Sequence, residues 1–521
     1  MVTEDQHEVI EFLEASATHG AQVERIDTHA SIVFLAGARA WKLKRAVRYD
    51  YLDYATVERR RAMCEAEVRV NRRTAPTLYL GVVPVTRGAG GALELDGRGT
   101  VVDWLVSMVR FDEDRLLDRV ASRRALDVRL AASLGSAIAT FHASAETRFD
   151  LGGAAALERV VRGNERGFAD AGGGILDHQA CVALTRDLRE RLASQASLLD
   201  QRRADGWVRH CHGDLHLGNI VLLDSGPTLF DAVEFNDDIA VVDVLYDLAF
   251  LLMDLERRAL PAQASAAWNA YLTATDDLRG VALMPMFLSC RAAIRAKTSA
   301  TASRLEGDMD ARGVFESASR EYLALAQRLL RPLKPCVVAV GGLSGAGKST
   351  LAWGLAPQIG ASPGALVVRS DDVRKRLAGV VPSDRLGREG YSAEMTVRVY
   401  QRVIERTVAI ARGGGVGIAD AAFLEPAQRT AIEQAAADAG VTFVGLWLDA
   451  SEPRRIERIS NRRDDVSDAD APIVRQQSLR ALGHVTWHRI GAERSAGEVA
   501  GDAIDVLRRQ TVQVVNDRRA L

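Results

Sequence analysis

The pattern of apolar and polar positions changes character along the chain. In the first hundred residues, short apolar runs bounded by turn residues predict β-strands. A charged stretch without Gly or Pro, which starts at the potential N-cap Thr56, predicts a helix. Strands are expected at 31–36, 40–43, 78–85 and 101–109, a helix is expected at 4–16 and another at 56–73, and a Gly-rich turn is expected at 87–99. This region therefore predicts a small sheet interrupted by one helix.

After residue 112 the pattern becomes mainly helical. Helices are expected at 126–143, 177–203, 238–257 and, with interruptions, 262–330. The Pro-flanked stretch 331–335 has the composition of a linker, so we place a domain boundary near residue 333. Beyond it, strands at 366–369, 416–418 and 441–448 alternate with helices at 348–359, 393–411 and 426–439. This alternation predicts a parallel sheet with crossover helices in residues 334–521.

Composition narrows the class of protein. The 521 residues, of which 47% are apolar and 26% charged, predict several soluble globular domains. The net charge of −2 gives no argument for a nucleic acid partner or an acidic membrane surface. The five cysteines form no CxxC pair, which fits a reducing cytoplasm, and no long uncharged apolar run predicts a transmembrane helix.

A polar loop at 210–219 carries the first candidate site. Asp214 can orient and deprotonate an acceptor hydroxyl, whereas Asn219 and Asp231 can hold the magnesium ions that neutralise ATP phosphates. The motif D-x-x-x-x-N, preceded by His212 and Gly213, resembles the catalytic loop of the aminoglycoside phosphotransferase and choline kinase superfamily. That resemblance covers about residues 25–330.

The resemblance implies a protein-kinase-like, bilobal domain over residues 1–333, with an N-lobe to about 107. It implies that Lys42 holds the ATP phosphates, with Lys44 as an alternative, and that Glu67 holds the lysine, with Glu65 as an alternative. It further implies that Asp243 and Asp247 brace the catalytic loop. No G-x-G-x-x-G precedes the lysine, so a pseudokinase stays open. Acidic candidates for meeting the ammonium groups of an aminosugar are Glu234, Asp237, Asp238 and Asp254.

A second candidate site is the motif G-x-x-x-x-G-K-S at 342–349, which lies between a short apolar strand expected at 336–340 and the helix expected at 348–359. Its backbone N–H groups would surround the β-phosphate, Lys348 would reach the β- and γ-phosphates, and Ser349 would ligate magnesium. The residues expected to contact the nucleotide are Gly342, Ser344, Gly345, Ala346, Gly347, Lys348, Ser349 and Thr350.

Three further stretches indicate a kinase rather than a motor ATPase. Asp371 lies in a segment that resembles the acceptor-binding and base segment of gluconate, shikimate and polynucleotide kinases. Asp420 closes another strand and could bind magnesium through water. A predicted lid would bring arginines to the transferring phosphoryl group, and its members are Arg454, Arg455, Arg458, Arg462 and Arg463.

Taken together, the motifs resemble a bacterial two-domain family, an aminoglycoside-phosphotransferase-like domain fused to a small P-loop kinase domain. That resemblance implies ATP and Mg²⁺ as cofactors and phosphoryl transfer to hydroxyls of small molecules such as a sugar, an aminosugar or a related metabolite. Two alternatives stay open: one nucleotide domain regulates the other, or the C-terminal domain phosphorylates a 5′-hydroxyl of a nucleoside or nucleic acid. The near-zero net charge argues against nucleic acid. The motifs leave the acceptor and the oligomeric state open.

Overall fold

The computed structural model describes residues 2–49, 51–171, 173–380, 384, 386–461, 471–510, 512 and 514. The chain divides into two compact units that do not follow one cut in the sequence. The first comprises Met1–Asp254 and Lys297–Arg312, and the second comprises Leu255–Ala296 and Gly313–Leu521. Residues 255–296 therefore pack with the P-loop part, although they precede residue 333. The domain boundary near residue 333 stays a prediction.

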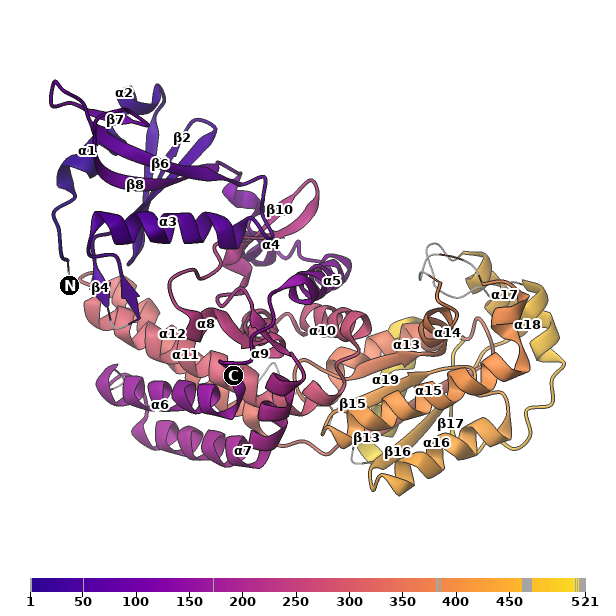
Figure 1. Ribbon diagram of the computed structural model, residues 1–521. Helices are drawn as coiled ribbons and strands as arrows, with labels where there is room; N and C mark the ends of the chain where they lie inside the picture. Colours follow the sequence, from indigo (N-terminus) through magenta and orange to yellow (C-terminus); the bar gives the residue numbers. More distant parts are fainter. Residues whose placement is uncertain are drawn as a thin grey trace. The chain divides into compact units, whose positions relative to one another are not determined.

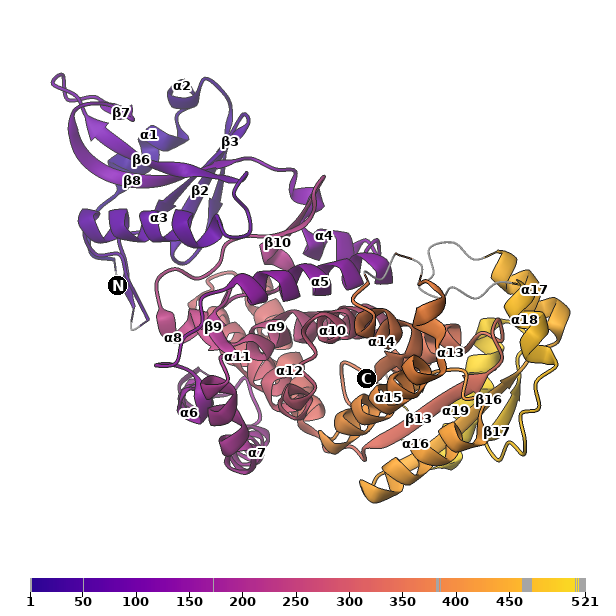
Figure 2. The same cartoon turned by 45° about the vertical axis from the view of Figure 1, so that its right-hand side comes forward.

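The first unit begins with a six-stranded antiparallel sheet (Figures 1 and 2). The strands, in their order across the sheet, are β1 (Val23–Asp27), β2 (Ser31–Ala36), β3 (Arg39–Lys44), β8 (Thr100–Val109), β6 (Tyr79–Arg87) and β7 (Leu93–Leu95). The four predicted strands are confirmed. Strand β1 was not predicted, and β7 lies where only a turn was expected, because strands this short and polar carry little apolar signal.

Two helices cover opposite faces of this sheet. Helix α3 (Val57–Asn71) begins as predicted, with the Thr56 hydroxyl accepting a hydrogen bond from Arg59 N at 3.3 Å. Phe34 packs in a core with α1 (His7–Glu14), whereas the adjacent Leu35 packs in the core under α3. Neighbouring strand residues point to opposite faces, so one strand serves both cores.

The rest of the first unit is mainly helical. Its elements are α4 (Leu117–Ser122), α5 (Val128–Ser144), α6 (Gly153–Ala171), α7 (His178–Ala204), β9 (Val208–His210), β10 (Ile220–Leu223), β11 (Gly226–Leu229), α8 (Asp237–Ala240), β12 (Val241–Asp243) and α9 (Val244–Arg257). The single helix expected at 238–257 is wrong in its first part. There Val241 and Val242, whose β-branched side chains favour strands, pair antiparallel with β9.

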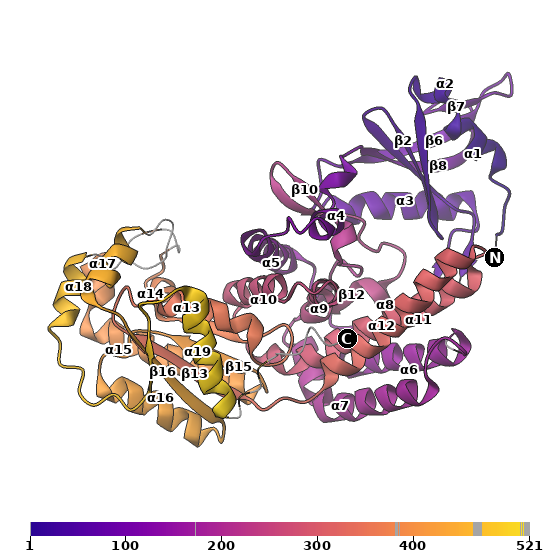
Figure 3. The ribbon, with the colours of Figure 1, turned by 180° about the vertical axis from the view of Figure 1, so that it is seen from behind.

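The second unit contains a five-stranded parallel sheet, as predicted. In spatial order its strands are β14 (Leu366–Arg369), β15 (Val416–Asp420), β13 (Cys336–Gly342), β16 (Thr442–Asp449) and β17 (His488–Gly491). Strand β17 was not predicted. Helices α15 (Ala393–Arg412) and α16 (Pro426–Asp438) lie in front of the sheet in Figure 1, whereas α13 (Lys348–Leu355) and α19 (Ala496–Arg509) lie in front of it in Figure 3.

Helix α10 (Pro261–Thr275) covers the edge strand β14 of the parallel sheet. The buried Asn269 amide donates to Ala365 O at 3.0 Å and accepts from Val367 N at 2.8 Å. One side chain thus replaces the missing neighbouring strand and satisfies two backbone groups of the sheet edge. The other helices of this unit are α14 (Ser370–Leu377), α17 (Glu452–Ser460) and α18 (Ala471–Ser478). Helices α11 (Met284–Leu305) and α12 (Met309–Leu330) contain the residues where the two units divide.

Within the described residues, no helix is both long and apolar enough to cross a membrane. All five cysteines are buried with free thiols. Burial raises the pKa of Cys64 to about 12, so this thiol stays protonated at neutral pH.

Candidate active sites

A β-hairpin brings the two predicted metal ligands of the first site to one place. Strands β10 and β11 pair with Ile220 opposite Leu229, and Phe230 N donates to Asn219 O at 3.0 Å. Asn219 and Asp231 therefore flank the open end of the same hairpin. Amide and carboxylate oxygens are hard ligands that suit Mg²⁺, so this pair fits the metal that the motif implies.

Asn219 also holds the predicted base. Its Nδ2 donates to Asp214 Oδ2 at 3.0 Å and to Asp214 O at 2.9 Å. The Asn219 amide oxygen is then directed elsewhere and can ligate a cation. The Asp214 side chain is 41% exposed, so a substrate hydroxyl can reach its carboxylate.

The buried Asp247 is hydrogen-bonded to the loop that carries Asp214. Its carboxylate accepts hydrogen bonds from His212 N at 3.1 Å and from Gly213 N at 2.8 Å, and His142 Nε2 lies 3.1 Å away. Gly213 has φ of +83°, and a Cβ there would lie 3.2 Å from Ile239 O. Asp247 thus makes the contacts expected of a brace, whereas Asp243 instead pairs with Arg202 at 2.7 and 2.9 Å.

The lysine strand β3 supplies two ammonium groups with different surroundings. Lys42 Nζ lies 2.8 Å from Glu67 Oε1 and 2.5 Å from Asp231 Oδ1. Lys44 Nζ lies 2.6 Å from Glu67 Oε2 and 2.5 Å from Glu234 Oε1, and its side chain is 1% exposed. Both side chains lie on one face of β3, so both reach Glu67, but the geometry brings Lys42 to Asp231, the predicted metal ligand, and buries Lys44.

Glu65, the alternative to Glu67, has a different partner. Glu65 is 50% exposed and pairs with Arg61 at 2.9 Å, one turn earlier on α3. Glu67 is fully buried; burial alone would raise its pKa, but the ammonium charges of Lys42 and Lys44 lower that pKa to about 2. Burial disfavours charged Lys42, yet Asp231 and Glu67 outweigh it and raise the Lys42 pKa. Glu67 and Lys42 are therefore both charged at neutral pH.

Asp231 is held in a left-handed backbone conformation, with φ of +62°. Its N–H donates to the Tyr79 hydroxyl at 3.1 Å, and the next residue, Ala232, donates to Asn71 Oδ1 at 2.8 Å. A positive φ at a residue other than glycine costs free energy. The two hydrogen bonds from Asp231 N and Ala232 N compensate for that cost and hold the backbone in this conformation. No motif in the sequence pointed to Tyr79 or Asn71.

His29 is a histidine that the sequence analysis did not single out. It lies in the connection between β1 and β2, and its ring is 6.4 Å from that of Tyr49 and 6.5 Å from that of Tyr51. Burial lowers the His29 pKa, while the charges of Asp214 and Lys42 act on that pKa in opposite directions.

The second site forms where β13 runs into α13. Gly342, Gly345 and Gly347 have φ of 142°, 83° and 99°, and a Cβ on Gly345 would lie 2.5 Å from Arg455 O. Glycine is therefore favoured at these three positions, because side chains rarely adopt positive φ and a Cβ on Gly345 would clash. Ser344 N donates to Gln477 Oε1 at 2.8 Å, and a phosphate oxygen is an acceptor of the same kind. Lys348 Nζ donates to Leu343 O at 3.2 Å.

Ser349 and Asp420 form the candidate metal site of this loop. Ser349 Oγ donates to Asp420 Oδ2 at 2.6 Å, and Arg369 Nε lies 3.4 Å from the same oxygen. Burial raises the Asp420 pKa, an effect that Arg369 and Lys348 oppose. A hydroxyl and a carboxylate in contact are suitable ligands for a hexacoordinate Mg²⁺ that keeps several waters.

Asp371 lies at the start of α14, next to this metal site. Two residues before Asp371, Arg369 of β14 lies opposite Asp420 of β15 in the sheet register, and the charge of Asp371 raises the pKa of Asp420. On the same helix, Arg374 donates to Gly390 O at 2.8 Å. Asp420 ends β15, and Asp371 follows the neighbouring strand β14 directly.

The described arginines of the expected lid differ in their hydrogen-bond partners and in their exposure. Arg458 donates to Ala346 O of the phosphate loop at 3.0 Å and to Ala492 O at 2.7 Å. Arg455 is buried and bonded to Ala450 O at 3.1 Å, whereas Arg454 is 38% exposed and pairs with Glu457. Arg458 is therefore the member that lies beside the phosphate loop. The expected Arg462 and Arg463 lie outside the described residues.

Two family models match the chain, one in each part. A phosphotransferase enzyme family model matches residues 43–283, and an AAA domain model matches residues 337–482. An uncharacterized protein of Mycobacterium tuberculosis is 29% identical over 491 residues, which cover 91% of this chain and 93% of that relative. An uncharacterized Mycobacterium bovis protein matches equally.

Solved structures of kinases resemble each part. A choline/ethanolamine kinase family protein from Mesorhizobium loti covers 62% of this chain and 94% of its own, with 14% identity and a TM-score of 0.39. A gluconokinase from Sinorhizobium meliloti covers 34% of this chain and 94% of its own, with 19% identity and a TM-score of 0.25. The two family matches confirm the predicted two-part composite: the N-terminal part matches a phosphotransferase enzyme family and the C-terminal part matches an AAA domain.

Proposed function

We propose that this protein is an ATP-dependent phosphotransferase with two nucleotide centres, each of which transfers the γ-phosphoryl group of MgATP to a hydroxyl of a small molecule. The observation that supports this most is that Lys42 bridges Glu67 and Asp231 at 2.8 and 2.5 Å. An ATP-positioning lysine, its glutamate and the metal-ligand aspartate are thus assembled as phosphoryl transfer requires.

In the first centre, Asp214 accepts the proton of the acceptor hydroxyl while that oxygen attacks the γ-phosphorus and ADP leaves. Asn219 holds the Asp214 carboxylate at 3.0 Å, so its orientation is fixed before the acceptor arrives. Lys42 neutralises the α- and β-phosphates, and Asn219 and Asp231 hold the magnesium. The brace by Asp247 keeps the loop in place at 2.8 Å from Gly213 N.

In the second centre, the phosphate loop and Lys348 hold the nucleotide, and Ser349 with Asp420 holds the magnesium. Asp371 orients the acceptor hydroxyl beside that metal site, and Arg458, together with Arg462, neutralises charge on the transferring group. The Ser349 Oγ–Asp420 Oδ2 hydrogen bond of 2.6 Å supports the metal assignment, because it brings two oxygen ligands together.

The acidic side chains that could meet an aminosugar have other partners. Glu234 binds Lys44 at 2.5 Å, Asp237 lies 3.2 Å from Arg148, Asp238 lies 2.9 Å from Arg159, and Asp254 accepts from Leu217 N at 3.2 Å. A polycationic acceptor would have to displace these ion pairs. We therefore propose a sugar or related polyol metabolite over an aminosugar for the first centre.

The test measures transfer of labelled phosphate from ATP to a panel of sugars, aminosugars, nucleosides and nucleic acid 5′ ends. Asp214→Asn should remove transfer to one acceptor class and Lys348→Ala transfer to another, each by at least about 100-fold. Asp224→Asn is the matched control, since Asp224 is 97% exposed and lies on the hairpin turn after the catalytic loop. If neither variant reduces transfer to any acceptor, the proposal fails.

A further inference from the structure

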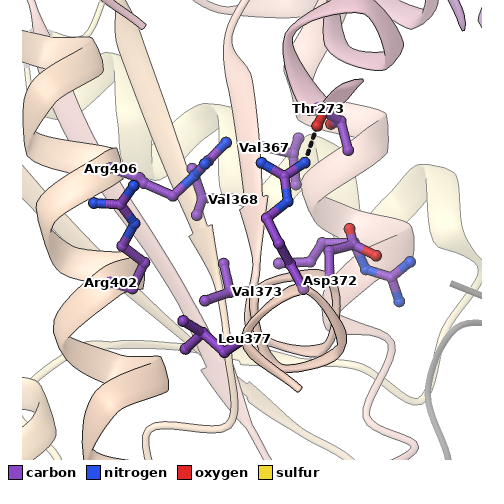
Figure 4. Close-up of a pocket in the computed structure, with 10 residues that line it drawn as sticks. Thr273, Val367, Val368, Asp372, Val373, Leu377, Arg402 and Arg406 are labelled. Atoms are coloured by element: carbon purple, nitrogen blue, oxygen red, sulfur yellow. Dashed lines mark hydrogen bonds between the residues drawn. The ribbon is translucent and has the colours of Figure 1, made fainter. Parts of the chain in front are cut away.

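A cavity of about 140 Å³ lies beside β14, and the arginines around it pair with carboxylates of the protein itself (Figure 4). Arg402 lies 3.4 Å from Asp276 and 3.3 Å from Glu405. Arg369, another lining residue, lies 3.4 Å from Asp420. These charges balance, so the cavity gives no argument for an anionic ligand. The N–H groups of the phosphate loop differ, because N–H groups at a helix N-terminus carry partial positive charge that attracts anions.

One hydrogen-bond acceptor of the phosphate loop comes from α18. Ser344 N donates to the side-chain oxygen Oε1 of Gln477 at 2.8 Å, although 133 residues separate the two in sequence. Gln477 lies in the last turn of α18 and is half-buried, whereas the preceding Gln476 is exposed. Ser344 belongs to the loop whose N–H groups are expected to surround the phosphates of a nucleotide. A neutral amide oxygen therefore takes a hydrogen bond that a phosphate oxygen also needs.

The packing of α18 on α17 fixes the place of Gln477. Val474, three residues earlier on the same face of α18, is fully buried. Ser478 Oγ accepts a hydrogen bond from the buried Arg455 of α17 at 2.7 Å and donates to Val474 O at 3.0 Å. Arg455 also lies against the phosphate loop, since a Cβ on Gly345 would lie 2.5 Å from Arg455 O. The helix that carries Gln477 is thus attached to a helix that contacts the same loop.

The amide oxygen and a phosphate oxygen exclude each other at Ser344. A backbone N–H is a single donor, so a phosphate oxygen has to replace Gln477 Oε1. A negatively charged acceptor binds an N–H roughly twice as strongly as a neutral one, so the phosphate displaces the amide. The loss of the Gln477 contact nevertheless offsets part of the binding free energy of the nucleotide.

We propose that Gln477 sets the nucleotide affinity of the second centre by competing with a phosphate oxygen for Ser344 N. This role rests on the proposed function of the loop at 342–349 as a nucleotide site. The competition is reciprocal, so a bound nucleotide releases Gln477 and removes one contact between α18 and the phosphate loop.

The experiment titrates the full chain with a fluorescent, non-hydrolysable ATP analogue and Mg²⁺. All variants carry Lys42→Met, so that binding at the first centre is weakened. Gln477→Leu should tighten binding about 3–10-fold, because the competing acceptor is removed. Gln477→Glu should weaken it at least about tenfold, because a carboxylate of the same shape holds the N–H more strongly and repels the phosphates. Gln476→Leu and Gln476→Glu are the matched exposed controls, and each should change the affinity less than about twofold.

Lys348→Ala in the same background separates two failures. If the analogue does not bind the Lys42→Met parent, or binds Lys348→Ala equally well, the loop is not a nucleotide site and the proposed second centre fails together with the role of Gln477. If Lys348→Ala removes binding, the role of Gln477 alone is overturned when Gln477→Leu does not tighten binding or Gln477→Glu does not weaken it. Glutamate has the shape of glutamine, so Gln477→Glu decides the question if circular dichroism shows that Gln477→Leu is unfolded.

Discussion

Lys42 Nζ and Asp231 Oδ1 lie 2.5 Å apart, although 189 residues separate them in sequence. The same ammonium group contacts the buried Glu67 at 2.8 Å. The lysine thus joins the helix of the N-terminal sheet to the residue that we propose as a metal ligand. Protein kinases depend on a lysine, a glutamate and an aspartate of this kind for phosphoryl transfer.

The two lysines of β3 should separate activity from stability. Lys42→Met should lower kcat of the first centre about 10²–10³-fold, whereas Glu67 keeps its second partner, Lys44. Lys44→Met removes the ammonium group that pairs with both buried carboxylates, Glu67 and Glu234. This should destabilise the first unit by about 3–5 kcal/mol. Urea unfolding and transfer assays on both variants measure this. Equal losses of stability would contradict the division of roles.

The stability of the protein should depend on pH through Glu67. Its folded-state pKa of about 2 lies below the usual 4.5, so its contribution is present above pH 4.5 and lost as pH falls toward 2. Between pH 7 and pH 3, wild type should lose roughly 2 kcal/mol of unfolding free energy that Glu67→Gln does not lose. The matched control is Glu65→Gln, on the same helix but half-exposed, which should keep the wild-type slope. Identical slopes for wild type and Glu67→Gln would refute this.

Much of this architecture follows from local patterns. Four strands of the parallel sheet and the phosphate loop were predictable, because buried parallel strands are continuous apolar runs and the loop has a spaced motif, whereas the mostly exposed β17 was not. The choice between Lys42 and Lys44 could not be predicted, because both side chains lie on one face of the strand and only their tertiary partners differ. The packing of α10 on β14 depends on Asn269, an ordinary residue in a helical pattern, and no local signal marks it.

The phosphate loop should tolerate no side chain at Gly345. Gly345→Ala would place a Cβ 2.5 Å from Arg455 O at a φ of +83°, so nucleotide affinity of the second centre should fall at least tenfold. Gly354→Ala is the matched control in the following helix, where a Cβ meets nothing within 4 Å. It should leave affinity unchanged and stabilise the helix by about 0.5–1 kcal/mol. Fluorescent nucleotide titration measures both, and normal affinity of Gly345→Ala would contradict the loop geometry.

Asn269 should protect the edge of the parallel sheet. Asn269→Ala leaves Ala365 O and Val367 N without their 3.0 and 2.8 Å partners and should cost about 1–3 kcal/mol. Hydrogen exchange at the Val367 amide should accelerate accordingly. Gln434→Ala, which removes only an exposed amide contact with Asp438, should change neither quantity. Unchanged exchange at Val367 in Asn269→Ala would show that the side chain does not hold this edge.

In the proposed function, one chain holds two separate nucleotide centres, one around Lys42 and one around Lys348. Calorimetric titration with a non-hydrolysable ATP analogue and Mg²⁺ tests it most directly. The wild-type protein should bind two nucleotides per chain, Lys42→Met and Lys348→Ala one each, and the double variant none. One nucleotide per wild-type chain, or loss of both sites in either single variant, would contradict the claim.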